Sequence, residues 1–185
     1  MNKIENVLNF SPQKEDVFIF DTNILIKVFY PTMSAVNSTP YIKLYEAICS
    51  SKSKIFISSI QISEFINRCI RFQFDLYKLS HSEIIEFKKD YRETDDYRKS
   101  MEAILEISKD ILLQFEPICD NFDLMSLENL FLHSFSYDFN DAFIAELSRN
   151  YGAILVTDDK DYANFLGELH IITNNKTLMM FVTKK

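Results

Sequence analysis

Short runs of consecutive apolar residues alternate along this chain with longer segments in which apolar residues recur every three or four positions. Runs rich in branched and aromatic residues are typical of strands buried on both faces, whereas the longer spacing is typical of amphipathic helices. The expected strands are residues 17–20, 54–57, 117–119, 153–157 and 169–173. The expected helical segments are residues 41–49, 59–69, 80–115, 126–132 and 141–151.

This alternation predicts an α/β fold: a three-layer α/β/α sandwich with a mainly parallel central sheet and right-handed crossover connections. An enlarged helical segment, from Ser80 to Phe115, separates the second expected strand from the third. Ser80 and Glu83 fit a capping box at the start of that segment, and Pro117 stops the helical pattern.

The composition favours one domain, residues 1–185, with a core of about residues 17–175. Hydrophobic residues make up 47% of the 185 residues, and two glycines and four prolines leave little material for linkers. Residues 1–16 lack the continuous apolar block of a signal peptide, and no run approaches the length of a membrane span. We therefore expect a soluble, cytoplasmic protein without a membrane partner.

The net charge of −7 and the pI near 5.0 argue against a protein that coats nucleic acid through a basic surface. They do not exclude an enzyme that meets phosphate groups through bound divalent cations. A site built from several carboxylates would contribute much of the negative charge, and a metal ion would invert its sign locally.

Acidic residues follow the expected strands at the points where those strands end. Asp21 follows the first strand directly, Asp158 and Asp159 follow a later one, and Glu64 and Asp141 lie near the starts of helices. Because the carboxyl ends of parallel strands share one edge of a sheet, where ligands bind, we expect these acids to converge. The alternative is structural: Asp21 or Thr22 and Asp141 would cap helices, and residues 158–161 would form a solvated loop.

A cluster of carboxylates is costly unless a hard cation binds, since like charges raise the pKa of each member. Oxygen ligands suit Mg²⁺ or Mn²⁺, and such ions promote phosphodiester hydrolysis. The sequence therefore favours a metal-dependent hydrolase.

Basic residues near these acids have two interpretations. Glu64, Arg68, Arg71 and Asp75 would form one polar stripe on a helix, and a solvated, salt-bridged face is the simpler explanation. Further along, Lys88, Lys89, Arg92, Arg98 and Lys99 alternate with acids. They would line a nucleic-acid path or keep the surface soluble, and the mixture of charges favours solubility.

Four segments together resemble the motifs of the PIN-domain nucleases, in their order and in their strand or helix context. They are Phe20-Asp21-Thr22-Asn23-Ile24-Leu25, a lone Glu64 in the helix after the second strand, Asn140-Asp141-Ala142-Phe143-Ile144-Ala145 and Leu155-Val156-Thr157-Asp158-Asp159-Lys160-Asp161. Each motif is weak alone, and the set is fairly specific. The resemblance covers roughly residues 17–175.

The resemblance implies an endoribonuclease that hydrolyses single-stranded RNA with Mg²⁺ or Mn²⁺, leaving a 5′-phosphate and a 3′-hydroxyl. Carried over by position, the acidic metal-binding residues are Asp21, Glu64, Asp141 and Asp159, and the polar supports are Asn23 and Thr157. Asp158 is a second candidate for the role of Asp159. Many small bacterial members of this family are VapC-type toxins held inactive by an antitoxin, so an antitoxin protein is a candidate partner.

Other interpretations stay open. The segment between Glu64 and Asp141 is longer than in compact toxin-like members, and its helices would cover the site, select RNA or form a homodimer surface. A PIN-like module that binds RNA or protein without turnover is one alternative function. Phosphoryl transfer through an Asp21 nucleophile, as in haloacid-dehalogenase-like phosphatases, is less favoured because Asn23 stands where those enzymes carry a second acid.

Overall fold

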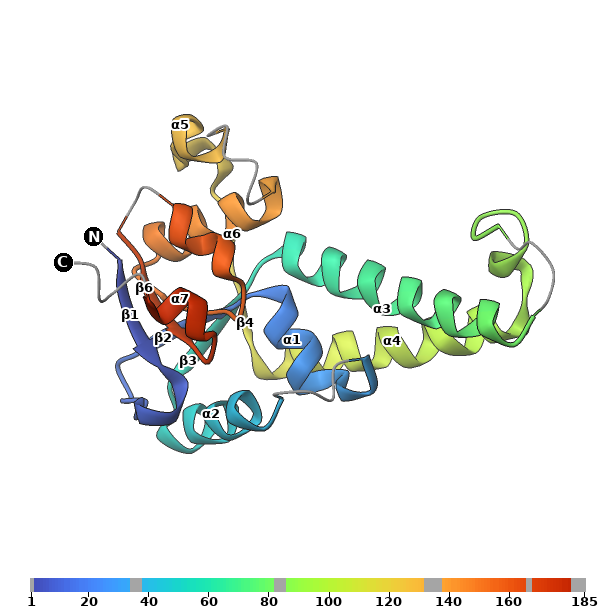
Figure 1. The fold of residues 1–185 in the computed structure, drawn as a ribbon, viewed down its shortest axis with the longest axis horizontal. Coiled ribbons are helices and arrows are strands. Elements are labelled where there is room, and N and C mark those ends of the chain that lie inside the picture. Colours follow the sequence, from blue (N-terminus) through green and yellow to red (C-terminus); the bar gives the residue numbers. More distant parts are fainter. Residues whose placement is uncertain (1, 34–37, 82–85, 132–137, 166–167, 181–185) are drawn as a thin grey trace.

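A six-stranded, all-parallel sheet forms the centre of the protein (Figure 1). The computed structural model describes residues 2–33, 38–81, 86–131, 138–165 and 168–180. Its strands are β1 (Lys3–Asn6), β2 (Val17–Phe20), β3 (Lys54–Ile57), β4 (Glu116–Pro117), β5 (Ile154–Val156) and β6 (His170–Thr173), in the spatial order β1-β6-β5-β2-β3-β4. The expected parallel α/β architecture is thus confirmed.

Helices connect and cover these strands. The α-helices are α1 (Thr22–Phe29), α2 (Thr39–Ser51), α3 (Ser59–Leu79), α4 (Asp95–Gln114), α5 (Leu127–Leu130), α6 (Phe139–Asn150) and α7 (Lys176–Met180). Short 3-10 turns are η1 (Val7–Asn9), η2 (Pro31–Met33), η3 (Tyr91–Glu93), η4 (Phe122–Leu124) and η5 (Lys160–Asn164). Across the described ranges, no helix combines the length and apolar character needed to span a bilayer.

Strand β2 shows why the molecule has three layers. Successive side chains of a strand point to opposite faces, so Phe18 and Phe20 enter one core and Ile19 enters the other. Helices α1 to α4 contribute to the first core, and α5, α6 and α7 contribute to the second. The continuous apolar run in β2 is therefore used on both of its faces.

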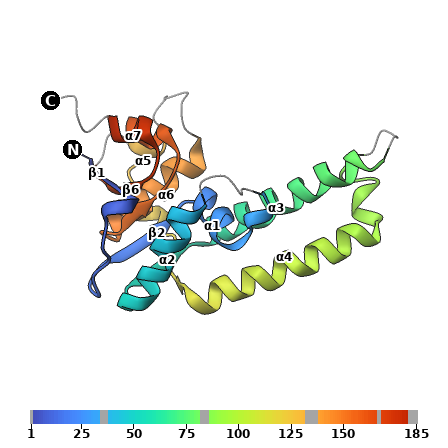
Figure 2. The ribbon, with the colours of Figure 1, turned by 60° about the horizontal axis from the view of Figure 1, so that its bottom comes forward.

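Helices α3 and α4 form an antiparallel pair that extends well beyond the sheet (Figures 1 and 2). We call this pair the arm. Aromatic rings fill its outer end, and they are Phe74, Tyr77, Phe87, Tyr91 and Tyr97. Edge-to-face and tilted ring contacts stabilise such clusters beyond the area they bury, and these rings continue the first core along the arm to its outer end.

The sequence predicted helical structure throughout the segment from Ser80 to Phe115, and the structure differs. Among the described residues of that segment, only α4 is an α-helix. Helix α3 continues to Leu79, and Ser80 ends it, donating a hydrogen bond of 2.9 Å to the Tyr77 carbonyl. Ser80 therefore does not begin a new helix, and Glu83, its expected capping partner, lies outside the described residues. The acids of the second helix do fall in its first turn, as Asp95 and Asp96 of α4.

Strand β1 was not predicted, and it lies outside the expected core of residues 17–175. Lys3 to Asn6 pair in parallel with β6 at the edge of the sheet. Polar side chains are tolerated there, and Glu5 lies 2.6 Å from the His170 ring nitrogen. The mixed composition of an edge strand hid it from a search for apolar runs.

Candidate metal and catalytic site

Strand topology brings the predicted acids to one edge of the sheet. Strands β2 and β5 are neighbours, with Phe20 opposite Val156, so Asp21 and the segment starting at Thr157 leave the sheet side by side. Glu64 enters from the second turn of α3, and Asp141 enters from the first turn of α6. The fold brings the four segments together as predicted, and we call Asp21, Glu64, Asp141 and Asp159 the acidic cluster.

Asp21 occupies the N-cap position of α1, yet its side chain makes no capping hydrogen bond. The carboxylate is 4% exposed, and its Oδ2 accepts a bond of 2.7 Å from the Thr157 hydroxyl and another from the Asn23 amide. Burial raises the pKa of Asp21 to about 7, the Thr157 hydrogen bond opposes the rise, and the charges of Glu64 and Asp159 add to it. Capping alone does not explain this side chain.

Asp141 combines a structural contact with a contact inside the acidic cluster. Its backbone N–H donates to Asp138 Oδ1 at 3.1 Å, and its Oδ2 accepts from the Asp138 N–H at 3.4 Å, which completes a capping box. Its Oδ1 accepts a hydrogen bond of 3.4 Å from the Tyr162 hydroxyl. Burial raises the pKa of Asp141 to about 8, and Asp21, Asp138 and Asp159 add to the rise.

Glu64 is held from three directions. The Thr22 hydroxyl donates to Oε2 at 3.0 Å, and the Asn140 amide reaches the same oxygen at 3.5 Å. On the other side Arg68, one turn along α3, lies 3.5 Å from Oε1. Residues from α1, α3 and α6 thus meet at one carboxylate.

The start of α3 is fixed to this edge of the sheet by a buried glutamine. Gln61 completes a capping box with Ser58, accepting from its backbone N–H at 2.8 Å. The Gln61 amide also donates a bond of 2.6 Å to the carbonyl of Phe20, the residue before Asp21. This contact sets the position of Glu64 relative to Asp21.

Asp158 and Asp159 point to different surroundings. The Asp159 N–H donates to the Thr157 hydroxyl at 3.0 Å, and the charge of Asp159 acts on Asp21 and Asp141. Asp158 instead forms an ion pair with Lys27 and accepts a hydrogen bond of 2.7 Å from the Tyr41 hydroxyl. Its carboxylate therefore neutralises a nearly buried lysine.

Several participating residues were not singled out from the sequence. Tyr162 is buried, and burial together with the charges of the surrounding acids raises its pKa well above the usual value, so its hydroxyl remains a neutral donor. Nothing in its local sequence marks it. Lys27 had a usable signal, because a single charge inside the apolar run of α1 usually needs a buried partner.

The donor chemistry fits a hard divalent cation. All four acids offer carboxylate oxygens, and electrostatic repulsion among them is what a cation would relieve. Within the part of the chain that the structure describes, no three acidic, histidine or cysteine side chains already stand close enough to share one ion. Ion binding would therefore have to draw the carboxylates together.

Comparisons with known proteins place the chain in a family. No curated protein matches it. Among solved structures, the chain is similar to VapBC2 from Rickettsia felis bound to a DNA fragment from their promoter, with 18% sequence identity and a TM-score of 0.46 over 85% of this chain and 98% of the matched chain. PIN domains are generally nucleases that depend on a divalent metal ion. The PIN domain family model matches residues 18–166, a span containing all four acids, and the chain belongs to that family.

Proposed function

We propose that this protein is a metal-dependent endoribonuclease that hydrolyses phosphodiester bonds of single-stranded RNA. The carrying observation is the group of four carboxylates at the carboxyl edge of the sheet, in which Asp21 and Asp141 have raised pKa values. Retaining such a group is costly, and membership of the PIN family supplies the chemistry that would use it.

In this proposal Asp21, Glu64, Asp141 and Asp159 hold one or two Mg²⁺ or Mn²⁺ ions. A bound ion would supply a water of lowered pKa and neutralise charge on the phosphate. Thr157 and Asn23 donate hydrogen bonds to Asp21 and so set the direction of its carboxylate oxygens toward a bound ion. Asp158 is not assigned as a ligand, because Lys27 and Tyr41 hold its carboxylate.

Metal binding must displace protons from the carboxyl groups of the acidic cluster. A pKa of about 8 for Asp141 means that its carboxyl retains a proton at neutral pH in the metal-free protein. The Tyr162 hydroxyl, 3.4 Å from Asp141 Oδ1, stays neutral and donates to the ionised form. We expect metal binding to release protons and to strengthen as the pH rises from 6 to 8.

The experiment is cleavage of a labelled, mixed-sequence single-stranded RNA by purified protein with Mg²⁺, Mn²⁺ or chelator. Asp21→Asn should abolish metal-dependent cleavage with the fold intact. Asp110→Asn removes an exposed carboxylate from α4 and is the matched control. Equal cleavage by wild type and Asp21→Asn would falsify the assignment.

A second candidate function is a catalytically silent module that binds RNA or protein. It is favoured by Arg68, which partly neutralises Glu64 within the acidic cluster without any metal ion. RNA affinity and cleavage measured in the same sample separate the two functions, since a silent module binds RNA and leaves it intact in every metal.

We further propose that the protein acts in the cytoplasm, as a toxin with an antitoxin partner or as a homodimer. These assignments rest on family membership alone. Growth arrest on induced expression, absent for Asp21→Asn, would support the toxin role. Size-exclusion chromatography with light scattering would give the oligomeric state.

A further inference from the structure

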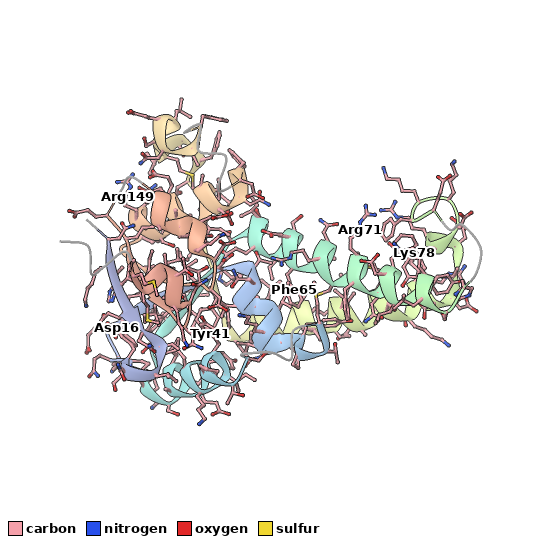
Figure 3. All side chains as sticks on the ribbon, viewed as in Figure 1. Asp16, Tyr41, Phe65, Arg71, Lys78 and Arg149 are labelled. Atoms are coloured by element: carbon pink, nitrogen blue, oxygen red, sulfur yellow. The ribbon has the colours of Figure 1, made fainter. Side chains whose placement is uncertain are left out.

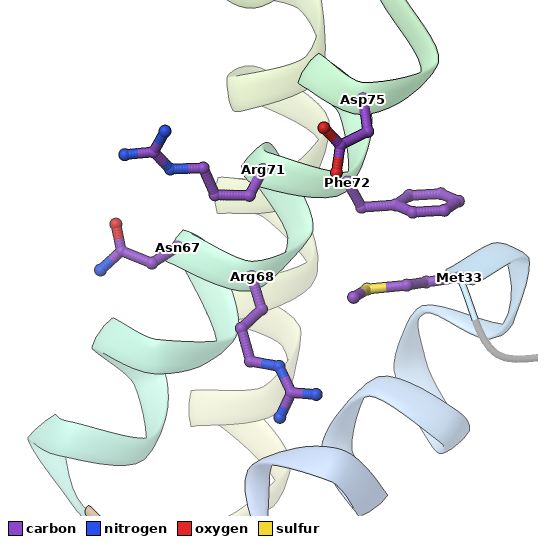
Figure 4. A pocket seen from close by; sticks show the side chains of 6 residues that line it. All are labelled: Met33, Asn67, Arg68, Arg71, Phe72 and Asp75. Atoms are coloured by element: carbon purple, nitrogen blue, oxygen red, sulfur yellow. The ribbon is translucent and has the colours of Figure 1, made fainter. Parts of the chain in front are cut away.

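A shallow groove runs along α3 (Figure 4), and Arg68 in its lining contacts Glu64 of the acidic cluster. It has a volume of about 290 Å³ and lies between α3 and η2. We call it the α3 groove, and its lining residues are Met33, Asn67, Arg68, Arg71, Phe72 and Asp75.

The α3 groove begins where the acidic cluster ends. Arg68 contacts Glu64 from one helical turn away, and Phe72 lies one turn further along the same helix. At 1.5 Å per residue these positions are about 6 Å and about 12 Å from Glu64 along the axis. A polymer with one phosphate at the acids would reach the groove with an adjoining segment.

One side of α3 offers the groove an aromatic ring, a thioether and a guanidinium. In Figure 4, Phe72 and Met33 face each other across a gap on one side of α3, and Arg68 points toward that side. An aromatic face opposite a polarisable thioether suits a flat, π-rich group. The Arg68 guanidinium beside them suits a phosphate.

Arg71 adds a second cation, directed to the other side of the helix (Figure 4). Its guanidinium carbon lies over the Phe87 ring, 3.9 Å from the centroid. That cation–π contact restricts the side chain before any ligand binds, while a guanidinium donates its N–H bonds outward in its own plane. Arg71 is therefore a partly pre-organised anion contact.

The α3 groove carries two arginines, one directed to each side of the helix, in a chain of net charge −7. General electrostatic attraction to a polyanion is unavailable, so local cations must supply it. Alternating phosphates and bases match a surface that combines arginines with a stacking platform. A base within a duplex is already stacked on its neighbours, so a stacking platform favours an unpaired base.

We propose that the α3 groove binds a nucleotide of single-stranded RNA adjoining the cleaved bond. The base stacks on Phe72, Met33 covers its other side, and Arg68 and Arg71 contact flanking phosphates. This inference rests on the proposed nuclease function, since it extends the same substrate from the acidic cluster onto the arm.

The test uses the Asp21→Asn protein, which we expect to bind RNA without cutting it, and a labelled single-stranded RNA of mixed sequence. Phe72→Leu keeps an apolar side chain but removes the stacking face, so RNA affinity should fall about tenfold. Phe72→Tyr retains the ring and should bind as Phe72 does. Leu79→Ala, on the same helix and 85% exposed, is the control and should leave affinity unchanged.

Salt dependence separates the phosphate contacts from stacking. Arg71→Ala should lower the slope of log affinity against log salt by about 0.7, the value for one lost phosphate contact on a single strand. Phe72→Leu should leave that slope unchanged. Arg98→Ala removes an exposed arginine from α4 of the same arm and should change neither quantity.

The wild-type protein is assayed for cleavage in parallel, which distinguishes failure of this inference from failure of the nuclease assignment. Metal-dependent cleavage by wild type, with unchanged RNA affinity in Phe72→Leu and Arg71→Ala, contradicts nucleotide binding in the α3 groove and supports the nuclease assignment. Reduced affinity in those variants without any cleavage by wild type retains RNA binding in the groove, but it overturns the nuclease assignment and with it the placement of the nucleotide beside a cleaved bond. A wild-type protein that neither binds nor cuts RNA overturns both.

Discussion

Thr157 Oγ1 donates a hydrogen bond of 2.7 Å to Asp21 Oδ2, which joins the ends of two neighbouring parallel strands. The same hydroxyl accepts a bond of 3.0 Å from the Asp159 N–H. One fully buried oxygen thus positions two of the four proposed metal-binding acids.

Replacing that hydroxyl should weaken metal binding. Thr157→Val keeps the shape of the side chain, but it removes the bond that lowers the pKa of Asp21 and leaves the Asp159 N–H without its acceptor. We expect Mn²⁺ affinity, measured by titration calorimetry, to fall about tenfold, whereas Thr157→Ser should retain it. A loss of stability with unchanged Mn²⁺ affinity would reduce Thr157 to a purely structural role.

Glu146 should stabilise the protein by holding α5 against α6. This fully buried carboxylate accepts hydrogen bonds of 3.0 Å from the Ser126 N–H, 2.6 Å from the Asn129 amide and 2.8 Å from Arg149 Nη2. Burial acts to raise the pKa of Glu146, but these bonds prevail and hold it below its usual value.

Glu146→Ala leaves these donors unpaired, so we expect the free energy of unfolding to fall by about 2–4 kcal/mol, measured with urea. Because the folded-state pKa is lowered, the contribution of Glu146 is present above pH 4.5 and is lost on acidification. Wild type and variant should therefore converge in stability at low pH. A constant difference down to acid pH would contradict this account.

The acidic cluster should give the metal-free protein the opposite pH dependence. Burial raises the pKa values of Asp21 and Asp141 to about 7 and about 8, from 3.8 in the unfolded chain. Between pH 4 and 8 the folded state holds more protons, so the free energy of unfolding falls as the pH rises. The expected fall is on the order of a few kcal/mol, measured by urea denaturation in chelator.

Two controls isolate the cluster in that experiment. Asp21→Asn removes one titrating group, so the variant should lose less stability between pH 4 and 8. Saturating Mn²⁺ stabilises the ionised carboxylates and should flatten the dependence in wild type. A metal-free wild type that becomes more stable from pH 5 to pH 8 would show that these acids do not repel one another as described.

The sequence was sufficient for the strands of the sheet other than β1 and for the convergence of the acids, because buried parallel strands have continuous apolar runs with polar residues at their ends. Strand β2 and Asp21 illustrate this directly. Two explanations for Asp141 followed from the sequence, a helix cap and a member of the acidic cluster, and both contacts exist. A local pattern cannot separate explanations that one side chain satisfies together.

Contacts between distant parts of the chain could not be predicted in the same way. Strand β1 depends on pairing with β6, since its own residues show no apolar run. The direction of the Asp158 side chain depends on Lys27 and Tyr41, which are 131 and 117 positions away in sequence. The length of α3 similarly depends on its packing against α4.

Asp158 and Asp159 should therefore separate in function although they are adjacent. The Asp158 side chain is 21% exposed and the Lys27 side chain 11% exposed, so their ion pair is largely removed from water. The Tyr41 hydroxyl donates a hydrogen bond to Asp158 Oδ1 and accepts one from the Asn174 N–H. Removing one partner of a largely buried pair leaves the other uncompensated.

We expect Asp158→Asn to lower the free energy of unfolding by about 3–5 kcal/mol with little change in Mn²⁺ affinity. Asp159→Asn should lower Mn²⁺ affinity without lowering the free energy of unfolding, since the Asp159 carboxylate faces the acidic cluster and repels Asp21 and Asp141. Adding Lys27→Met to Asp158→Asn should recover part of the lost stability, because no unpaired charge then remains. Urea denaturation and Mn²⁺ titration of the three variants measure both quantities, and a loss of Mn²⁺ affinity in folded Asp158→Asn equal to that in Asp159→Asn would make Asp158 a ligand.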